Sequence, residues 1–449
     1  MKDGSTLSFH HHLRNGDDVM RQVLAACADL GLRDLHIAPS SLFPCHAALV
    51  PFLHDGTVTR ITTSYMTGPL AEAVKQGALA RPVRLQSHGG RAAAIAGGRL
   101  KIDAAFIATP AVDRAGNLSG AAGPEACGPL GYAMVDAAHA AQVVAVTDTV
   151  LDAVPRSCIP AARVSRIVGV ARIGDAGQIV SGTTARPPSP AGQAIADMTA
   201  RLIGCSGLLR DGFRLQTGAG ATSLAVARAV APVMSERGIT GEFAAGGITV
   251  VLVDMLDAGL FRRLWDVQAF DLAAVRSYAE DARHLPMSAE DYASPDRPDS
   301  IARQLDVMIL GAAEVDTAFN VNVTCASDGR IIGGSGGHAD TAAGARLPIV
   351  TTPLRAGGMP KLVERLTCLT TPGATIGAIV TEAGIAVHPS RPDLAADARR
   401  AGLPLRTVED LRQMAEDGAP SRAPGRGMGR VGAECEAPDG TVIDEIRLP

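Results

Sequence analysis

The stretch that decides the fold is IDAAFIATPAVDRAGN, residues 102–117, because the chain contains a second version of it, LDVMILGAAEVDTAFN, at residues 305–320. Each copy starts with a short apolar run bounded by polar residues, the pattern of a buried parallel strand. Three polar positions recur 203 residues apart: Asp103 and Asp306, Asp113 and Asp316, Asn117 and Asn320. The repeat indicates two related domains.

Strand and helix signals alternate on both sides of these two copies. The alternation favours parallel sheets with helices packed on their faces. The expected elements are a helix over 13–31, strands over 32–39, 58–64, 142–147 and 213–217, and a helix over 223–237. We therefore predict an α/β fold of two open α/β domains facing each other across a cleft.

A Pro-, Ser- and Gly-rich stretch, SGTTARPPSPAG at residues 181–192, is the best domain boundary. It predicts an N-terminal domain over residues 1–190 and a C-terminal domain over 191–449. Near the end of the chain, residues 411–430 suggest a flexible loop. The last segment, 431–449, suggests a hairpin that turns at Asp439-Gly440.

Composition excludes several classes of protein. A chain of 449 residues exceeds the size of a single core, and 42 basic against 46 acidic residues give no electrostatic reason to expect nucleic acid as a partner. No apolar run of about 18 residues is present, so no membrane span is expected. The eight cysteines form no Cys-x-x-Cys pair, which fits reduced thiols in a cytoplasmic protein.

The first candidate for chemistry is the glycine-rich string GGSGGHAD at residues 333–340. Closely spaced glycines expose backbone N–H groups and allow a ligand to approach, which suits the oxyanion of an acyl-transfer intermediate. The residues assigned to this loop are Ser335, Gly336, Gly337 and His338. An ordinary flexible turn is the alternative interpretation of the same string.

The second candidate is GEFAAGGI, residues 241–248, which contains Glu242, Gly246 and Gly247. The two glycines are assigned, with the glycine-rich string, to the thioester and oxyanion site. A carboxylate at the end of a strand would point above the carboxyl edge of the sheet and can act as an acyl nucleophile. A solvated surface glutamate is the alternative.

The third candidate is SHGGR, residues 87–91, in which His88, Gly89 and Arg91 are expected to bind substrate together with Asn320. The planar guanidinium of Arg91 suits a carboxylate-rich substrate because it makes bidentate hydrogen bonds. No metal site is expected: three adjacent histidines, His10–His12, cannot all face one ion.

Several long strings make the chain similar to the alpha subunits of citrate lyase, within the CoA-transferase superfamily. They are LSFHHHLRNGD (7–17), QSHGGR (86–91), AEVDTAFNVNV (313–323) and GGSGGHADTAAGA (333–345). The resemblance runs from residue 7 to the C-terminus. It implies two CoA-transferase (NagB/RpiA-like) domains, and relatives that usually carry an extension before the first string.

The resemblance also implies a reaction in which citrate and an acetyl-carrier protein give citryl-carrier protein and acetate. A beta subunit would then cleave the citryl group, within an oligomeric complex. The implied cofactor, a phosphoribosyl-dephospho-CoA group, would be supplied by the gamma subunit, the acyl carrier, and none would be bound by this chain. By the same resemblance Glu242 falls where related transferases place their nucleophile.

Three alternatives remain open at this stage. The chain could act on free CoA esters, or serve only as a scaffold for the complex. If it is the transferase, either Glu242 or a carboxylate of citrate itself could attack the thioester.

Overall fold

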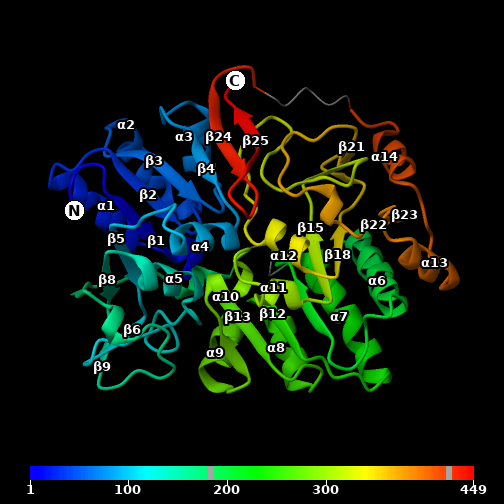
Figure 1. Cartoon of the computed structure of the whole chain (residues 1–449), viewed down its shortest axis with the longest axis horizontal. Helices are drawn as coiled ribbons and strands as arrows, with labels where there is room; N and C mark the ends of the chain where they lie inside the picture. The colour runs from blue at the N-terminus through cyan, green and yellow to red at the C-terminus, as the bar shows by residue number, and fades with distance from the viewer. Residues whose placement is uncertain (181–185, 421–426) are drawn as a thin grey trace.

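The structure is a computed structural model that describes residues 1–180, 186–420 and 427–449. Two large sheets dominate it, one formed mostly by the first 170 residues and one by residues 214–387 (Figure 1). Both are parallel except at one edge, where a hairpin closes each sheet. The predicted α/β class and the paired domains are confirmed.

The first sheet has nine strands. In spatial order they are β10 (Arg166–Gly169), β8 (Gln142–Thr147), β5 (Ala104–Ala108), β1 (Thr6–Phe9), β2 (Leu35–Pro39), β3 (Val58–Thr63), β4 (Val83–Leu85), β24 (Val431–Glu436) and β25 (Val442–Arg447). Its helices are α1 (Val19–Asp29), α2 (Val50–His54), α3 (Pro69–Lys75), α4 (His88–Ala96) and α5 (Gly131–His139).

The second sheet has eight strands. In spatial order they are β14 (His284–Pro286), β13 (Leu264–Ala269), β12 (Phe243–Ile248), β11 (Arg214–Thr217), β15 (Val307–Gly311), β18 (Leu347–Thr351), β22 (Ala378–Thr381) and β23 (Gly384–Val387). Its helices are α6 (Pro190–Cys205), α7 (Ala221–Glu236), α8 (Val250–Asp257), α9 (Leu272–Glu280), α10 (Ala289–Ala293), α11 (Ile301–Gln304), α12 (His338–Gly344), α13 (Pro392–Arg400) and α14 (Val408–Glu416).

The sequence repeat is a structural repeat. β5 lies between β1 and β8, and β15 lies between β11 and β18 in the same way. A small three-stranded sheet begins directly after β5 and another directly after β15. The first consists of β6 (Ala111–Asp113), β7 (Leu118–Ser119) and β9 (Val150–Leu151), and the second of β16 (Glu314–Asp316), β17 (Val321–Asn322) and β21 (Leu362–Val363).

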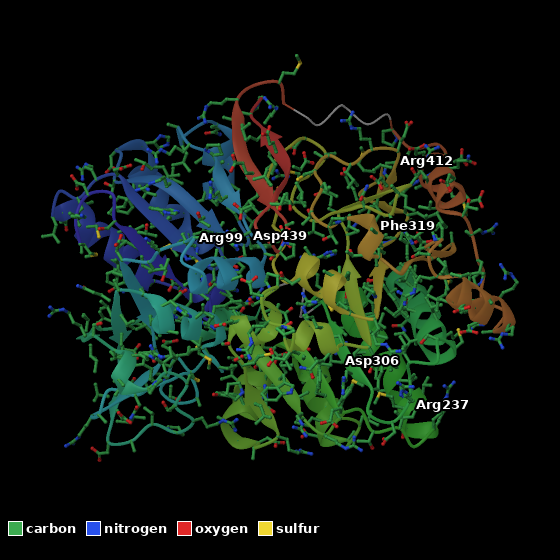
Figure 2. The ribbon with its side chains drawn as sticks, viewed as in Figure 1. Arg99, Arg237, Asp306, Phe319, Arg412 and Asp439 are labelled. Atoms are coloured by element: carbon green, nitrogen blue, oxygen red, sulfur yellow. The ribbon has the colours of Figure 1, made fainter. Side chains whose placement is uncertain are left out.

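The repeated aspartates explain why these residues recur. Asp103 accepts a hydrogen bond from the backbone N–H of Thr6 at 2.7 Å, and Asp306, labelled in Figure 2, accepts one from Arg214 at 3.0 Å. Each bond joins the start of the central strand to its neighbour. Since a buried backbone N–H needs an acceptor, the same residue type serves both domains.

The repeated asparagines close a turn. The side chain of Asn320 donates to Asp316 at 3.0 Å and accepts from the backbone of Gly373 at 2.8 Å. Asn117 makes the matching bonds, to Asp113 at 2.9 Å and from Ala161 at 2.9 Å. These bonds give Asn320 a structural role in place of the substrate contact expected for it.

The C-terminal hairpin departs from the simple domain division. It turns at Asp439-Gly440 as predicted, but β24 then pairs in parallel with β4, so the chain returns to the first sheet (Figure 1). A division into residues 1–190 and 191–449 therefore does not describe the two sheets. Part of the expected linker, residues 181–185, lies outside the described residues.

The predicted loop over 411–430 is wrong at its start, because α14 continues to Glu416. Thr407 caps this helix and accepts from the N–H of Asp410 at 3.0 Å, and Val408, Leu411 and Ala415 are buried at helical spacing. Residues 421–426 lie outside the described residues. No helix in the described ranges is long and apolar enough to cross a membrane.

We expect Asn320→Ala to lower the free energy of unfolding by about 1–3 kcal/mol, because it leaves the Gly373 N–H without its acceptor. The matched variant Asn117→Ala should lose a similar amount. Urea unfolding of both variants, with citrate kinetics on the folded protein, is the test. A raised citrate KM in Asn320→Ala with unchanged stability would contradict the structural role and show that Asn320 contacts the substrate.

Candidate functional site

The carboxyl edges of the two sheets meet, and the strings that the sequence singled out lie in contact there. His88, the first residue of α4, donates its backbone N–H to the carbonyl of Gly336 at 2.8 Å. Gln268 of β13 donates its side-chain amide to the carbonyl of His11 at 2.8 Å. We call this region the interdomain site; it consists of His10–His12, Arg14, Phe43, Tyr65, His88, Tyr132, Gln268, Phe270 and the loop 333–337.

The three histidines that follow β1 are buried in this site. His10 and His12 hydrogen-bond to each other through their Nδ1 atoms, and His11 Nδ1 lies 2.6 Å from Ser40 Oγ. Burial, partly offset by the charge of Asp17, lowers the pKa of His10 to about 4. Burial and the charge of Arg91 lower that of His88 to about 3. All of these rings are therefore neutral at pH 7.

Three ring nitrogens of these histidines are incompletely satisfied. His10 Nε2, His12 Nε2 and His88 Nδ1 are buried without a well-formed hydrogen bond among the described residues, although the backbone of Ala108 lies near His10 and that of Val267 near His12. A buried polar atom without a partner costs about 1–3 kcal/mol, so such atoms collect where a ligand or water completes the bonding. The cluster has the properties of a binding site for a polar ligand.

Arg14 supplies the positive charge of the site. Its guanidinium packs over the rings of Phe43 and Phe270, with centroids at 5.2 and 4.6 Å. Among the described residues it has neither an ion pair nor a hydrogen bond, and its Nε is buried. Burial lowers its pKa, while the nearby Tyr65 and Tyr132 oppose that shift. A carboxylate ligand would satisfy this cation.

The sequence analysis missed Arg14, although it lies in the string LSFHHHLRNGD. Its backbone is left-handed, with φ of +52°, in a short 3-10 helix η1 (Arg14–Gly16). This conformation is uncommon for a residue with a side chain and is concentrated at functional sites. No composition or spacing signal marks it, so only the structure could reveal it.

The glycine loop contributes in a different way from the one expected. Gly336 donates its N–H to the carbonyl of Ser64 at 3.1 Å, so that N–H is not available to an oxyanion. The N–H groups of Gly334, Ser335 and Gly337 have no acceptor in the described part of the chain. These three remain the candidate oxyanion donors, and Gly336 holds the loop against the first sheet.

Close packing explains two of these glycines. A Cβ on Gly334 would lie 2.4 Å from the carbonyl oxygen of Ser64, and one on Gly337 would lie 2.4 Å from the Tyr292 hydroxyl. His338 does not face the site: its ring bonds Thr371 Oγ1 at 2.8 Å and the carbonyl of Gly311 at 2.9 Å. His338 therefore anchors the loop.

Gly246 and Gly247 lie at the carboxyl end of β12, where the strand bulges and Gly246 has φ of +103°. A Cβ on Gly247 would lie 2.3 Å from the ring of Phe270. Gly247 therefore lets Phe270 occupy the position beneath Arg14. The pair shapes the cation site, a role that differs from the oxyanion role expected of it.

Glu242 lies on the wrong edge of the sheet for the role expected of it. It precedes β12, at the amino end, whereas the interdomain site lies at the carboxyl ends. Its carboxylate pairs with Arg262 at 3.3 Å and Arg263 at 3.0 Å, and its side chain is 31% exposed. Glu242 therefore matches the alternative interpretation, a solvated surface glutamate. It does so because it precedes the strand and does not lie at the strand's carboxyl end.

Arg91 is also engaged elsewhere. It is buried inside α4 and makes a bidentate ion pair with Asp136, at 3.0 and 3.1 Å, and a hydrogen bond to the carbonyl of Ala38. Binding a substrate carboxylate would require breaking this buried pair. Arg91 therefore stabilises α4, and the substrate contact expected of it does not form.

Asp340 holds the two domains together at the site. Its carboxylate accepts from Ser87 Oγ at 2.6 Å and from the N–H of Gly89 at 2.9 Å. Burial raises its pKa to about 7, against the opposing effect of these hydrogen bonds. Gly89 permits the contact, since a Cβ there would lie 1.9 Å from the Ala293 carbonyl.

The fold is shared with a more distant protein, and the sequence places the chain in a family. The alpha subunit of malonate decarboxylase from Acinetobacter baumannii has the same fold, with a TM-score of 0.66 over 92% of this chain and 89% of its own at 15% identity. The citrate lyase, alpha subunit (CitF) family matches residues 1–448. The chain therefore belongs to the citrate lyase alpha subunit family.

Individual relatives agree with this assignment. The citrate lyase alpha chains of Escherichia coli (strain K12) and Klebsiella pneumoniae are 44% and 43% identical to it, over 99% and 100% of this chain and 88% of each relative. The structure of a Streptococcus mutans citrate lyase alpha subunit in complex with citrate superposes with a TM-score of 0.97 at 41% identity, covering all of this chain and 88% of that one.

The neutral histidines predict how stability depends on pH. The folded pKa values of His10 and His88, about 4 and about 3, lie below the ordinary value of 6.5, so the unfolded chain binds more protons between these limits. The contribution of these histidines to stability is therefore complete above pH 6.5 and falls as the pH decreases toward 4, whereas the raised pKa of Asp340 acts in the opposite direction. Urea unfolding at intervals of pH measures this slope.

The control for this prediction is an exposed histidine, His54. His88→Gln should reduce the slope by about one proton, whereas His54→Gln should leave it unchanged. A His88→Gln variant whose stability has the same pH slope as the parent would contradict neutral burial of His88, because Asp340 contributes equally to both proteins.

Proposed function

We propose that this chain transfers an acyl-carrier thioester from acetyl-carrier protein to citrate at the interdomain site, giving citryl-carrier protein and acetate. The observation that carries the proposal is Arg14, a half-buried cation whose Nε is buried and which has no protein anion within ion-pair distance among the described residues. It lies in a region where both halves of the molecule contribute buried polar atoms without a partner among the described residues, such as His88 Nδ1 and Gln268 Oε1. Membership of the citrate lyase alpha subunit family supports the same reaction.

Citrate fits the chemistry of these groups. One of its carboxylates can pair with the guanidinium of Arg14, for which a planar bidentate bond is the favoured geometry. The free nitrogens of His10, His12 and His88 can bond the remaining oxygens or the hydroxyl. Neutral histidines offer both donors and acceptors, depending on the tautomer, and so suit a ligand with both.

We favour attack by citrate itself over a covalent enzyme intermediate. Three buried or half-buried carboxylates of the surrounding elements are each engaged: Asp17 with His46 at 3.3 Å, Asp266 with His284 at 3.0 Å, and Asp340 with Ser87 and Gly89. The carboxyl end of β12 carries two glycines where a nucleophilic side chain would be required. Citrate brings a carboxylate of the same chemical type.

The proposed route consists of two acyl-transfer steps. A citrate carboxylate oxygen attacks the acetyl carbonyl, the C–S bond breaks, and the carrier leaves as a thiolate, which leaves a mixed citryl-acetyl anhydride. The thiolate then attacks the citryl carbonyl, and acetate departs with the bridging oxygen. The free N–H groups of Gly334, Ser335 and Gly337 are placed to stabilise oxyanions.

The partners follow from the same proposal. The names of the relatives as alpha chains imply a multi-subunit citrate lyase. We expect a beta subunit that cleaves the citryl group and a gamma subunit, the acyl carrier, whose phosphoribosyl-dephospho-CoA arm bears the thioester. The arm is a substrate of this chain, and we expect the complex in the cytoplasm.

Arg14→Lys tests the anchor. Lysine keeps the charge but lacks the bidentate fork, so the KM for citrate should rise about 10–100-fold while the KM for the acetyl-carrier changes little. Steady-state kinetics with each substrate varied gives both constants. Equal effects on the two substrates, in a variant with normal stability, would remove Arg14 from the citrate site.

Glu242→Gln tests the nucleophile. Because Glu242 lies at the far edge of the sheet, this variant should keep transfer within about two-fold of the parent, an effect typical of a surface change. Hydroxylamine or borohydride should trap no adduct on Glu242 when acetyl-carrier protein is supplied without citrate. Loss of transfer together with a trapped Glu242 adduct would establish the covalent route instead.

A further inference from the structure

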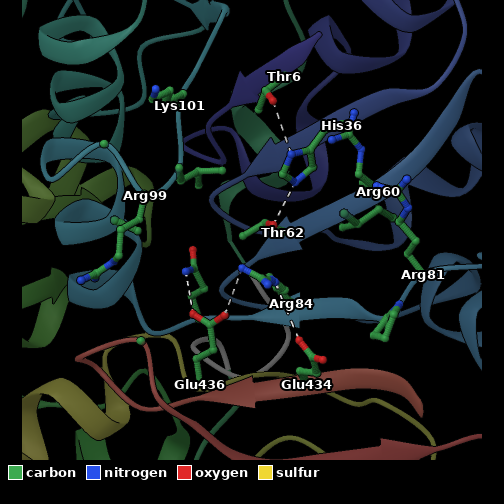
Figure 3. A pocket seen from close by; sticks show the side chains of 17 residues that line it. Thr6, His36, Arg60, Thr62, Arg81, Arg84, Arg99, Lys101, Glu434 and Glu436 are labelled. Carbon is green, nitrogen blue, oxygen red and sulfur yellow. Dashed lines mark hydrogen bonds and ion pairs between the residues drawn. The ribbon is translucent and has the colours of Figure 1, made fainter. Parts of the chain in front are cut away.

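A pocket with a volume of about 600 Å³ opens on one face of the first sheet (Figure 3). It shares no residue with the interdomain site. Its floor is formed by side chains that alternate along neighbouring strands and so point to the same face, among them Thr6, His36, Thr62, Gln86 and Glu436. The end of α4, the segment after it and the turn of the C-terminal hairpin form its rim.

The pocket is rich in positive charge. Its lining includes two glutamates and five basic side chains. The basic residues are Arg60, Arg81, Arg84, Arg99 and Lys101. Figure 3 shows them on several sides of the pocket, with Glu434 and Glu436 along β24. Such an excess of one charge in a concave site attracts an anion.

Arg60 donates to the carbonyls of Gly4 and Asp34, but the other cations are largely without protein partners. Among the described residues, Arg81, Arg99 and Lys101 have neither a side-chain hydrogen bond nor an ion pair of 4.0 Å or less. Arg84 is 62% exposed and only loosely paired, at 3.8 Å to Glu434 and 3.9 Å to Glu436. Guanidinium groups left in this state suit phosphate, which accepts bidentate hydrogen bonds.

The positive charge of the pocket also affects the histidine in its floor. Burial is the main cause that lowers the pKa of His36 to about 4, and Arg60, Arg84 and Arg81 lower it further. His36 is therefore neutral, held between the hydroxyls of Thr6 and Thr62. The positive potential in the pocket comes from the arginines and the lysine alone.

The β24 side of the pocket offers acceptors. Gln86 is 6% exposed and donates its amide to Glu436 at 2.8 Å, which leaves its Oε1 buried without a donor. Glu436 and Glu434 add carboxylate oxygens to the same side. These groups need hydroxyl donors, and carboxylates commonly bind the hydroxyls of a sugar.

We infer that this pocket binds a phosphorylated sugar, with the phosphate among the arginines and the hydroxyls on Gln86, Glu434 and Glu436. The volume is in the range of small-molecule sites. No Phe, Tyr or Trp is among the residues that line it, and its one histidine, His36, is hydrogen-bonded between Thr6 and Thr62. The inference is independent of the proposed transferase activity.

Calorimetric titration of the full chain with ribose 5-phosphate tests the inference. We expect one saturable site per chain, much weaker binding of inorganic phosphate or ribose alone, and no displacement by citrate. Arg84→Gln with Arg99→Gln should weaken binding at least about ten-fold, because each removes a charge-assisted hydrogen bond donor. Arg399→Gln, an exposed arginine of α13, is the matched control and should bind normally.

Absence of saturable binding to the folded chain would overturn the inference. So would equal binding in the double variant, or displacement by citrate as effective as by ribose 5-phosphate, which would make the pocket a general anion site. Binding is measured without any reaction, so failure of the transferase proposal would leave this result unaffected.

The sugar phosphate has two possible sources, and kinetics distinguish them. If it is part of the carrier's prosthetic arm, ribose 5-phosphate should compete with acetyl-carrier protein, and the double variant should raise the carrier KM. If it is a free metabolite, the variant should bind it poorly while the carrier KM stays at the parent value. Either result requires the pocket to bind the phosphorylated sugar.

Discussion

The contact between the start of α4 and the loop before α12 is the constraint on which the site depends. Asp340 accepts from Ser87 and Gly89, and His88 donates to Gly336, so the carboxyl edges of two separate sheets are fixed at hydrogen-bond distance. Four residues from two domains thereby hold the position of His88 against the glycine loop. Gly89 is required because the carbonyl of Ala293 would occupy the space of its Cβ, and Gly336 is favoured because its φ is +50°.

This contact creates the electrostatics of the site. Burial keeps the histidines after β1 neutral and leaves Arg14 as the cation held between two aromatic rings. Asp266 and Asp340 are tied to other partners, so the field favours an incoming anion. In the route that we propose, substrate binding and the use of a citrate carboxylate as nucleophile both follow from this arrangement.

The sequence predicted the architecture because the architecture is repeated. Asp103 and Asp306 make the same bond, and the turns around Asn117 and Asn320 are closed in the same way, so a spacing of polar residues was enough. The return of β24 to the first sheet was not predicted, because edge pairing between distant segments leaves no local signal. The hairpin itself was predicted from its Asp-Gly turn.

The site was predicted in part, for a similar reason. The strings around His88 and Gly336 were identified, and they meet. The roles of Arg91 and Glu242 were wrong because residue type does not reveal which edge of a sheet, or which partner, a side chain faces. Arg14 was missed because its left-handed backbone and its position between Phe43 and Phe270 arise only in the folded chain.

The central claim, that a carboxylate of citrate attacks the thioester directly, is tested most directly by following oxygen through a single turnover. Citrate labelled with ¹⁸O in its carboxylates is mixed with excess enzyme and acetyl-carrier protein, and the acetate is analysed by mass spectrometry. Direct attack predicts that the first acetate released carries one ¹⁸O, since the bridging oxygen of the anhydride comes from citrate. Unlabelled acetate, with ¹⁸O appearing in a protein carboxylate, would contradict the account.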